Sequence, residues 1–278
     1  MAAITAALVK ELRDATNVSM MECKRALVNA DGDIAQATKL LREQGMAVAA
    51  KKASRTANQG LIETSATDDG KTVALIEVNC ETDFVARNPG FQSFVAQMAA
   101  KANETDEALA DSVKDIVTAQ IAEIGENVII KRNTRFTLQG PGLIQSYIHM
   151  GGKVGVLIEV ACQNDETAQA PSFQELCKDL TLHIAACNPS CLTSDEIDAD
   201  VLAEERAIFA KQAEGKPEQI IDKLVEGKLQ KFYSETCLLN QGFVKEDKQS
   251  ITQLLEEKSK ELQDTISIRR FVRYQLGA

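Results

Sequence analysis

The sequence predicts an α+β protein in which a small helical domain precedes a duplicated core with antiparallel sheets. Three observations lead to this prediction. The first 56 residues carry helix signals, residues 60–92 recur at residues 142–174, and a second helical stretch interrupts the second copy. The expected divisions are a helical domain at residues 1–56, the two core halves at residues 57–140 and at residues 141–187 with 237–278, and an inserted hairpin at residues 188–236.

Residues 1–56 have the pattern of three short helices. The first is marked by an apolar face, the second by a capping box at residues 19–22, and the third by a start at Asp33 and a stop at Gly45. Residues 47–58 have few large apolar side chains and form a further helical stretch or a linker. A compact three-helix unit of this kind resembles a ubiquitin-associated-like domain.

The repeat defines the core. Residues 60–92 and residues 142–174 align without gaps at an offset of 82, and 15 of the 33 aligned positions are identical, a density that chance does not produce. Each copy has the pattern of a strand, a hairpin turn at residues 68–70 or 151–152, a second strand and a helix with one apolar face. Duplication of one β-β-α unit explains this pattern.

The second copy is split by an insertion. In the first copy, a helix that ends at Gly125 precedes a strand at residues 127–132, and the same helix and strand return only after residue 250. The intervening residues 188–236 carry two apolar helical faces separated by a Gly-Lys-Pro stop, which predicts an antiparallel helical hairpin. Because such a hairpin has little else to pack on, its outer face is a candidate surface for a partner or for self-association, as is the core.

Charge and cysteine content exclude several classes of protein. The chain has 31 basic and 41 acidic residues, which argues against nucleic acid as a ligand, because binding to phosphate backbones needs clustered Lys and Arg. Seven cysteines, an odd number scattered through apolar segments, indicate free and mostly buried thiols in a reducing compartment. The first ten residues lack a secretory pattern, and no run approaches the roughly 18 apolar residues of a membrane helix. We therefore expect a cytoplasmic protein without a membrane or nucleic-acid ligand.

The charge is unevenly distributed. Residues 1–56 carry nine basic and six acidic residues, so a basic head precedes a strongly acidic body. This asymmetry indicates two surfaces that meet different parts of a partner.

The common catalytic motifs are absent from the sequence. Its only histidines, His149 and His183, stand in no zinc-protease or triad-like motif, and the sequence contains no phosphate-binding loop motif. A Gly-Gly-Lys run at residues 151–153 lies in a hairpin turn instead of before a helix. We expect a protein that is not an enzyme and that needs no cofactor.

A zinc site is the main alternative among the cysteines. His183, Cys187 and Cys191 recur every fourth residue, with Cys177 nearby, and zinc favours such ligands. However, the Asn-Pro-Ser run at residues 188–190 interrupts the helix that this spacing requires. We therefore favour buried thiols over a metal or redox site.

The differences between the two copies indicate where function lies. Phe84 has Glu166 as its counterpart, so the scaffold does not require an aromatic ring at this position, and a contact with another molecule is favoured over a place in the core. His149 stands where the first copy has Thr67, and both a surface histidine without a partner and a partner contact fit this position.

Met20 and Met21 are a further candidate contact. They stand in the first turn of the second predicted helix. The alternatives are packing in the core of the head and an exposed, polarisable surface for another protein.

Several stretches together resemble the translation elongation factor Ts family. They are the run TDFVARN at residues 82–88, LVKELR at residues 8–13, MMECKRAL at residues 20–27 and FVK at residues 243–245. The resemblance covers nearly the whole chain. It implies a ubiquitin-associated-like head, a two-part α+β core with an inserted coiled-coil hairpin, and guanine-nucleotide exchange on elongation factor Tu in its GDP-bound and nucleotide-free forms.

The resemblance also implies the site. The family's magnesium-dislocating motif corresponds to Thr82, Asp83, Phe84 and Val85, and further contacts with the partner's GTPase domain correspond to Met20, Met21 and His149. Several bacterial relatives continue past the last core strand into a helix that grips the partner, whereas this sequence ends at Ala278, so we expect that contact to be missing or replaced. The rival hypothesis is an adaptor that binds partners through its head and does not promote exchange.

Overall fold

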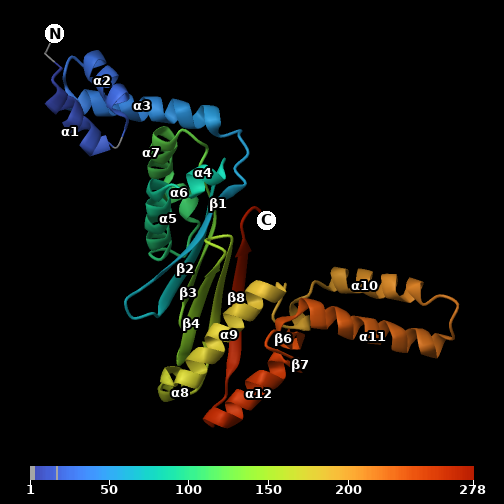
Figure 1. Ribbon diagram of the computed structural model, residues 1–278. Helices are drawn as coiled ribbons and strands as arrows, with labels where there is room; N and C mark the ends of the chain where they lie inside the picture. The colour runs from blue at the N-terminus through green and yellow to red at the C-terminus, as the bar shows by residue number, and fades with distance from the viewer. Residues whose placement is uncertain (1–3, 17) are drawn as a thin grey trace.

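The computed structural model describes residues 4–16 and 18–278, and it combines helices with antiparallel sheets (Figure 1). The first sheet has the strand order β1 (Gln59–Ala66), β2 (Thr72–Cys80) and β3 (Ile129–Thr137). The second has the order β4 (Gly142–His149), β5 (Val154–Ala161) and β8 (Ser267–Gln275). The predicted α+β class with antiparallel sheets is confirmed. The first three residues, where no secretory pattern was found, lie outside the described residues.

The head consists of three helices, α1 (Ala6–Thr16), α2 (Met20–Asn29) and α3 (Ile34–Lys52). Ser19 and Asp33 cap α2 and α3, because their side chains accept hydrogen bonds from backbone N–H groups three residues later. The helices enclose a small apolar core of Val9, Leu12, Cys23, Ala26, Leu27, Ala30, Ala37 and Leu41. The head therefore has a hydrophobic centre of its own.

The expected stop at Gly45 is wrong, because α3 continues to Lys52. Gly45 is buried where α3 crosses α7 (Lys114–Ile124), and a Cβ placed there would lie 3.5 Å from the Cβ of Ala122. An internal glycine weakens a helix by only about 1 kcal/mol, and contacts with a neighbouring helix outweigh that loss. Gly45 thus allows close helix packing, and residues 47–52 belong to the same helix.

Helices cover the outer face of each sheet. The first sheet is covered by α5 (Pro89–Ala102), α6 (Leu109–Ser112) and α7, and the second by α8 (Asp165–Gln169), α9 (Pro171–Cys187) and α12 (Ile251–Leu262). Both β2 and β5 are buried along almost their whole length because each has a helix layer on one face and the opposite sheet on the other. The strand expected at residues 127–132 is β3, which begins at Ile129 and continues to Thr137, and the strand expected after residue 250 is β8.

A long helical hairpin projects from the second half of the core (Figure 1). A short helix, η1 (Ser194–Glu196), precedes α10 (Ala199–Gln212), which packs beside α11 (Glu218–Thr236). The chain returns through η2 (Leu238–Asn240) and a ribbon of β6 (Gly242–Phe243) and β7 (Glu246–Ser250). The hairpin seam is narrow: Leu229 and Ala213 are buried in it, whereas Val201, Ile208 and Ile220 are exposed.

The two sheets pack face to face through equivalent residues. The apolar layer between them is formed by Ile62, Val73, Leu75, Phe136, Ile144, Leu157 and Tyr274. Ile62 and Leu75 of the first sheet have Ile144 and Leu157 as counterparts at the offset of 82 seen in the sequence. Along the last strands, β3 and β8, the offset becomes 138, so Phe136 corresponds to Tyr274.

Two buried carboxylates hold the halves together in a reciprocal way. Glu77, which is fully buried on β2, accepts hydrogen bonds from the Arg132 guanidinium at 2.8 Å and from the Gly277 N–H at 3.1 Å. The Arg132 guanidinium also lies 4.2 Å from the ring centre of Tyr274 in the other half. A charged arginine over an aromatic face is attracted to it, so this side chain links both halves.

The second carboxylate repeats this arrangement. Glu159 on β5 accepts hydrogen bonds from Arg270 at 2.7 Å and from the Gln139 N–H at 3.0 Å, and Arg270 lies 4.1 Å from the ring centre of Phe136. Glu159 has an additional partner in Arg269, at 3.2 Å. Buried carboxylates need such partners, because an unpaired charge is costly to remove from water.

A glycine at the start of β1 and of β4 explains one of the identities between the copies. Gly60 and Gly142 have φ angles of 137° and 146°, and a Cβ there would lie 2.1 Å from the Val78 carbonyl oxygen or 2.3 Å from that of Val160. Any side chain would collide with the neighbouring strand. Only glycine fits at both positions.

The turn after β5 is held by Asp264, and this carboxylate should make stability pH-dependent. A hydrogen bond from the Thr167 hydroxyl, with others from the Gln163 and Asn164 N–H groups, lowers the pKa of Asp264 to about 2. An aspartate in an unfolded chain has a pKa of about 3.9, so the carboxylate stabilises the fold above that pH, and this contribution is lost as the pH falls through about 2. The free energy of unfolding of Asp264→Asn, measured with urea, should therefore change less with pH between about pH 4 and 2 than that of the unsubstituted protein. Asp200→Asn, at an exposed hairpin position, is the control. The prediction is contradicted if the free energy of unfolding changes with pH equally in Asp264→Asn and in the unsubstituted protein.

Candidate functional site

The candidate site is the short turn between β2 and α5. Residues 83–86 form one helical turn, α4 (Asp83–Ala86). Thr82 caps it by accepting a hydrogen bond from the Val85 N–H at 3.3 Å. Asn88 then caps α5 by accepting from the Gly90 N–H at 2.7 Å, and Pro89 occupies the first helical position.

The turn presents Phe84 to solvent. Its side chain is 81% exposed, whereas Ala86 is buried and Val85 packs against the core of the first half. A phenylalanine is seldom left so exposed, because burying it is worth about 1.5–3 kcal/mol. The turn is therefore anchored on its inner side and carries an unpaired aromatic ring on its outer side.

Two charged side chains flank the ring. Asp83 and Arg87 form an ion pair at 2.9 Å, four residues apart along the helical turn. Asp83 also lies in the first turn of α4, where a negative charge is favourable. Arg87 is exposed and Asp83 is half-buried, so the pair remains open to solvent and can be separated at low cost by another molecule.

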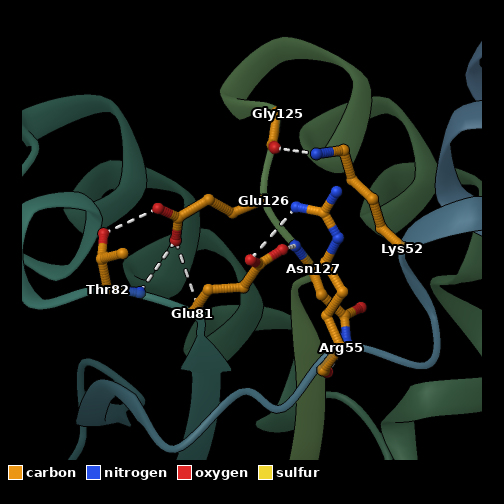
Figure 2. A network of polar contacts seen from close by, with 7 residues as sticks. All are labelled: Lys52, Arg55, Glu81, Thr82, Gly125, Glu126 and Asn127. Atoms are coloured by element: carbon orange, nitrogen blue, oxygen red, sulfur yellow. Dashed lines mark hydrogen bonds and ion pairs between the residues drawn. The ribbon is translucent and has the colours of Figure 1, made fainter.

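Glu126 fixes the backbone of the turn, and the sequence analysis did not single it out. Its carboxylate accepts hydrogen bonds from the N–H groups of Glu81 and Thr82 at 3.1 and 3.0 Å and from the Thr82 hydroxyl at 2.7 Å (Figure 2). Asp264 holds the equivalent turn in the second half, at the offset of 138. The alignment of the two copies ended at residue 92. Extending it would have paired the acids at positions 126 and 264 and so would have indicated Glu126.

A second set of contacts joins the turn to the end of the head. Glu81 accepts a hydrogen bond from the Asn127 N–H at 2.7 Å, which lowers the pKa of the Glu81 carboxyl, and it also pairs with Arg55 at 3.4 Å. The Asn127 side chain donates to the Arg55 carbonyl at 2.8 Å, and Lys52 donates to the Gly125 carbonyl (Figure 2). The segment that follows α3 therefore lies against the base of the site.

Replacement of Glu126 should loosen the turn. In Glu126→Gln the side-chain NH2 group cannot accept hydrogen bonds, so at least one of the three contacts is lost and the rest lose their charge. We expect a loss of about 1–2 kcal/mol in the free energy of unfolding, and faster hydrogen exchange of the Thr82 and Val85 amides.

Asp264→Asn is the matched control for this prediction, because it should loosen the turn after β5 and leave the amides of residues 82–85 unchanged. Unchanged exchange at Thr82 in Glu126→Gln would show that the turn holds its shape without this carboxylate.

His149 lies at the same end of the core as the turn. It ends β4, and the following residues cross to the first half, where the Gly152 carbonyl accepts from the Ile62 N–H at 2.8 Å and Lys153 donates to Gln59 at 3.3 Å. Gln59 pairs with Cys80, three residues before Asp83. His149 is exposed, with its Nδ1 2.8 Å from the Tyr147 hydroxyl.

The methionine pair lies elsewhere. Met20 and Met21 are 45% and 65% exposed, which favours the surface alternative over core packing. Figure 1 shows α2 at the outer end of the head, with α3 leading from it to the core and α4. The structure thus brings residues 82–85 and His149 to one end of the core and leaves the methionines on a separate surface.

Comparison with known proteins identifies the family. A family model described as Elongation factor TS matches residues 81–278. An elongation factor Ts from Clostridium perfringens (strain SM101 / Type A) is 44% identical over 99% of this chain and 93% of its own length. One from Nitratidesulfovibrio vulgaris (strain DP4) is 41% identical over 99% of this chain and 96% of its own length, and one from a Nitratiruptor species is 43% identical over 99% of this chain and 93% of its own length. The chain belongs to the elongation factor Ts family. Its role therefore lies in translation elongation.

Within this elongation factor Ts chain, His183 serves the fold. It is fully buried on α9, where it contacts Gln241 Oε1 at 2.9 Å and accepts from the Val244 N–H at 3.2 Å, and burial lowers its pKa. A neutral imidazole with both nitrogens occupied joins α9 to the returning chain after the hairpin.

The cysteines are free, as expected, and five of the seven are buried: Cys23, Cys80, Cys162, Cys177 and Cys237. Cys187 is exposed, and Cys191 is half-buried. Burial raises the pKa of Cys80, directly before the candidate site, to about 11, so this thiol is protonated near neutral pH. In the ranges 4–16 and 18–278, no helix is both long and apolar enough to cross a membrane.

Proposed function

We propose that the chain is a guanine-nucleotide exchange factor for elongation factor Tu: it binds the GDP-bound GTPase, disturbs the magnesium and nucleotide site, and promotes GDP release so that GTP can bind. The observation that carries this proposal is the exposed Phe84 ring on a turn whose backbone is held from behind by Glu126. Membership of the elongation factor Ts family supports it.

A hydrophobic wedge suits this task. Magnesium requires oxygen ligands in near-octahedral geometry, and a phenylalanine can supply none. Phe84 would act by entering between elements of the partner and moving the groups that hold the metal and its waters, with Asp83 and Thr82 setting the angle of entry and Val85 anchoring the turn. Such a wedge must be stiff, because a mobile turn would yield instead of displacing the partner.

The remaining candidate residues extend the contact. His149 lies at the same end of the core as the turn, and Met20 and Met21 offer a soft apolar surface on the head. Two separate contacts with one partner are consistent with the uneven charge of the sequence, in which a basic head precedes an acidic body. The bound partner would thus meet the head and the core together, both in the GDP-bound form and in the nucleotide-free form.

The mechanism is thermodynamic and involves no covalent chemistry. If binding of the factor and binding of GDP each weaken the other, linkage makes the two effects equal. Each tenfold weakening of GDP affinity corresponds to a coupling free energy of about 1.4 kcal/mol, so rapid exchange requires a coupling several times that large. The chain would therefore act as a binding protein and not as an enzyme.

Release of a fluorescent GDP analogue tests the proposal. GDP-loaded elongation factor Tu is mixed with the protein at micromolar concentration in excess unlabelled GDP, and the decay of fluorescence is followed. We expect release to accelerate in proportion to the concentration of the protein. Binding without acceleration, measured in parallel by calorimetry, would favour the adaptor hypothesis.

A further inference from the structure

The neck of the hairpin, formed by residues 190–192 and 236–239, places two cysteines side by side. Backbone hydrogen bonds join the two segments, from the Ser190 N–H to the Thr236 carbonyl and from the Leu238 N–H to the Cys191 carbonyl, both at 2.9 Å. Cys191 and Cys237 lie directly opposite each other in this pairing. The hairpin thus leaves and re-enters the core across this one bridge.

The two thiols are already in contact. Their Sγ atoms lie 3.6 Å apart, and the two residues face each other in a single parallel bridge, Cys237 at the junction of α11 and η2. Backbones paired in a β-bridge are separated by about 4.7–4.9 Å, and a disulfide requires Cα atoms about 4.4–6.8 Å apart. A small rotation of each side chain would therefore bring the sulfurs to bonding distance without moving the backbone.

One of the two thiols opens to a positively charged cleft. Cys191 is half-buried and lines a cleft of about 410 Å³, whose walls include Arg269, Arg270 and Arg273. Glu196 lies on the same cleft, and Glu159 pairs with Arg269 and Arg270, so the cleft keeps a small excess of positive charge from Arg273. Cys237 is buried behind Cys191. A small reagent that carries negative charge can approach Cys191 through this cleft, while Cys237 stays out of reach.

We propose that Cys191 and Cys237 are a thiol modification site that forms a reversible disulfide by exchange with a small anionic disulfide such as oxidised glutathione. The Cys191 thiolate attacks one sulfur of the reagent, which releases one thiol and leaves a mixed disulfide on Cys191. Cys237 then loses its proton and attacks the Cys191 sulfur, which releases the second thiol. Two protein thiols are oxidised, and the reagent disulfide is reduced to two thiols.

The order of the two steps follows from exposure. Burial raises the pKa of Cys237 to about 12, so at neutral pH this thiol is protonated and reacts only when a disulfide is held beside it. The contact between the two sulfurs supplies that proximity. Because a thiolate is the attacking species, bond formation should accelerate as the pH rises.

The bond would fix the direction of the hairpin. It joins residues 46 positions apart, which enclose the whole of α10 and α11. Oxidation would close the base of the hairpin covalently, and reduction would leave only the backbone pairing. The modification acts on the hairpin and is independent of the Phe84 turn.

Mass spectrometry of the full chain tests this site. The protein is incubated with oxidised glutathione at pH 8, alkylated and digested. We expect a cross-linked peptide pair containing Cys191 and Cys237 with a loss of two hydrogens, reversed by dithiothreitol. The Cys191→Ser variant should form neither the bond nor an adduct at the neck, Cys237→Ser should accumulate a glutathione adduct on Cys191, and Cys187→Ser, the control on the exposed thiol of α9, should behave as the unsubstituted protein.

A second arm tests the cleft. Hydroxyethyl disulfide, which is uncharged, should form the same bond several-fold more slowly than oxidised glutathione at equal concentration, and the difference should shrink in high salt. Equal rates would overturn the role of the arginines. Absence of the cross-link after long incubation, a lasting glutathione adduct on Cys191 in the unsubstituted protein, or a bond from Cys187 would overturn the pairing itself.

Discussion

Phe84→Ala should abolish most of the acceleration of GDP release while leaving the fold intact. Truncation of an aromatic residue at the centre of a contact typically costs at least about 2 kcal/mol, which corresponds to a loss of about 30-fold. The measurement is the release rate of a fluorescent GDP analogue from elongation factor Tu at a fixed concentration of the variant in the range where the rate is proportional to concentration. Because the side chain is 81% exposed, circular dichroism and the melting temperature should not change.

Glu166→Ala is the matched control, since Glu166 occupies the position of Phe84 in the second copy, within α8. Glu166→Ala should accelerate GDP release as much as the unsubstituted protein does. Phe84→Leu should fall between the two, because it keeps apolar volume but loses the flat ring. An unchanged rate with Phe84→Ala would remove the wedge from the mechanism, and a large drop in melting temperature would show that the ring serves the fold.

Arg132→Met should destabilise the protein by about 3 kcal/mol, because among the contacts of the described residues it leaves the fully buried Glu77 carboxylate with only the Gly277 N–H. Methionine retains the apolar part of the side chain, so the loss reports mainly on the charge and on the contact with Tyr274. Urea unfolding followed by circular dichroism gives the change in free energy. Adding Glu77→Gln to this variant should recover part of the loss, because the unpaired charge is then gone.

The duplicated core supplies the comparison for this prediction. Arg270→Met makes the equivalent change in the second half, but Glu159 keeps Arg269 at 3.2 Å and should therefore lose only about half as much stability. The first half has Lys131 in place of Arg269, and Glu77 has no such second arginine among the described contacts. Equal losses for the two variants would show that Arg269 does not compensate.

Much of the fold was predictable because its signals are local or repeated. Ser19 and Asp33 mark helix starts because their side chains accept backbone hydrogen bonds, and Gly125 marks a helix end because it adopts a left-handed conformation. The offset of 82 exposes the repeated strands and helices without any knowledge of contacts. Gly45 was misjudged because a glycine that ends a helix and one that lets two helices approach look alike in sequence. The partner helix α7 lies about 70 residues further along the chain, so only the folded structure distinguishes them.

Some features of the candidate site could likewise be predicted from the sequence, and others could not. Comparison of Phe84 with its counterpart Glu166 was enough to indicate that the fold does not require an aromatic ring at this position, because the two copies share the same pattern of strands and helices. Glu126 escaped notice because its contacts with Glu81 and Thr82 span 45 and 44 positions of sequence. The contacts of Glu77 and Glu159 with the opposite half escaped for the same reason.

The sequence by itself determined the duplicated plan, the helical insertion and the identity of the residues at the turn, since periodicity, capping and repetition are written in the order of side chains. Only the tertiary structure decided that Phe84 points to solvent, that His149 lies at the same end of the core, and that Cys191 touches Cys237. Exposure and contact between distant positions depend on how whole sheets and helices pack. That packing depends on how apolar surface is buried and how buried charges are paired over the entire chain, so it cannot be inferred from a local sequence pattern.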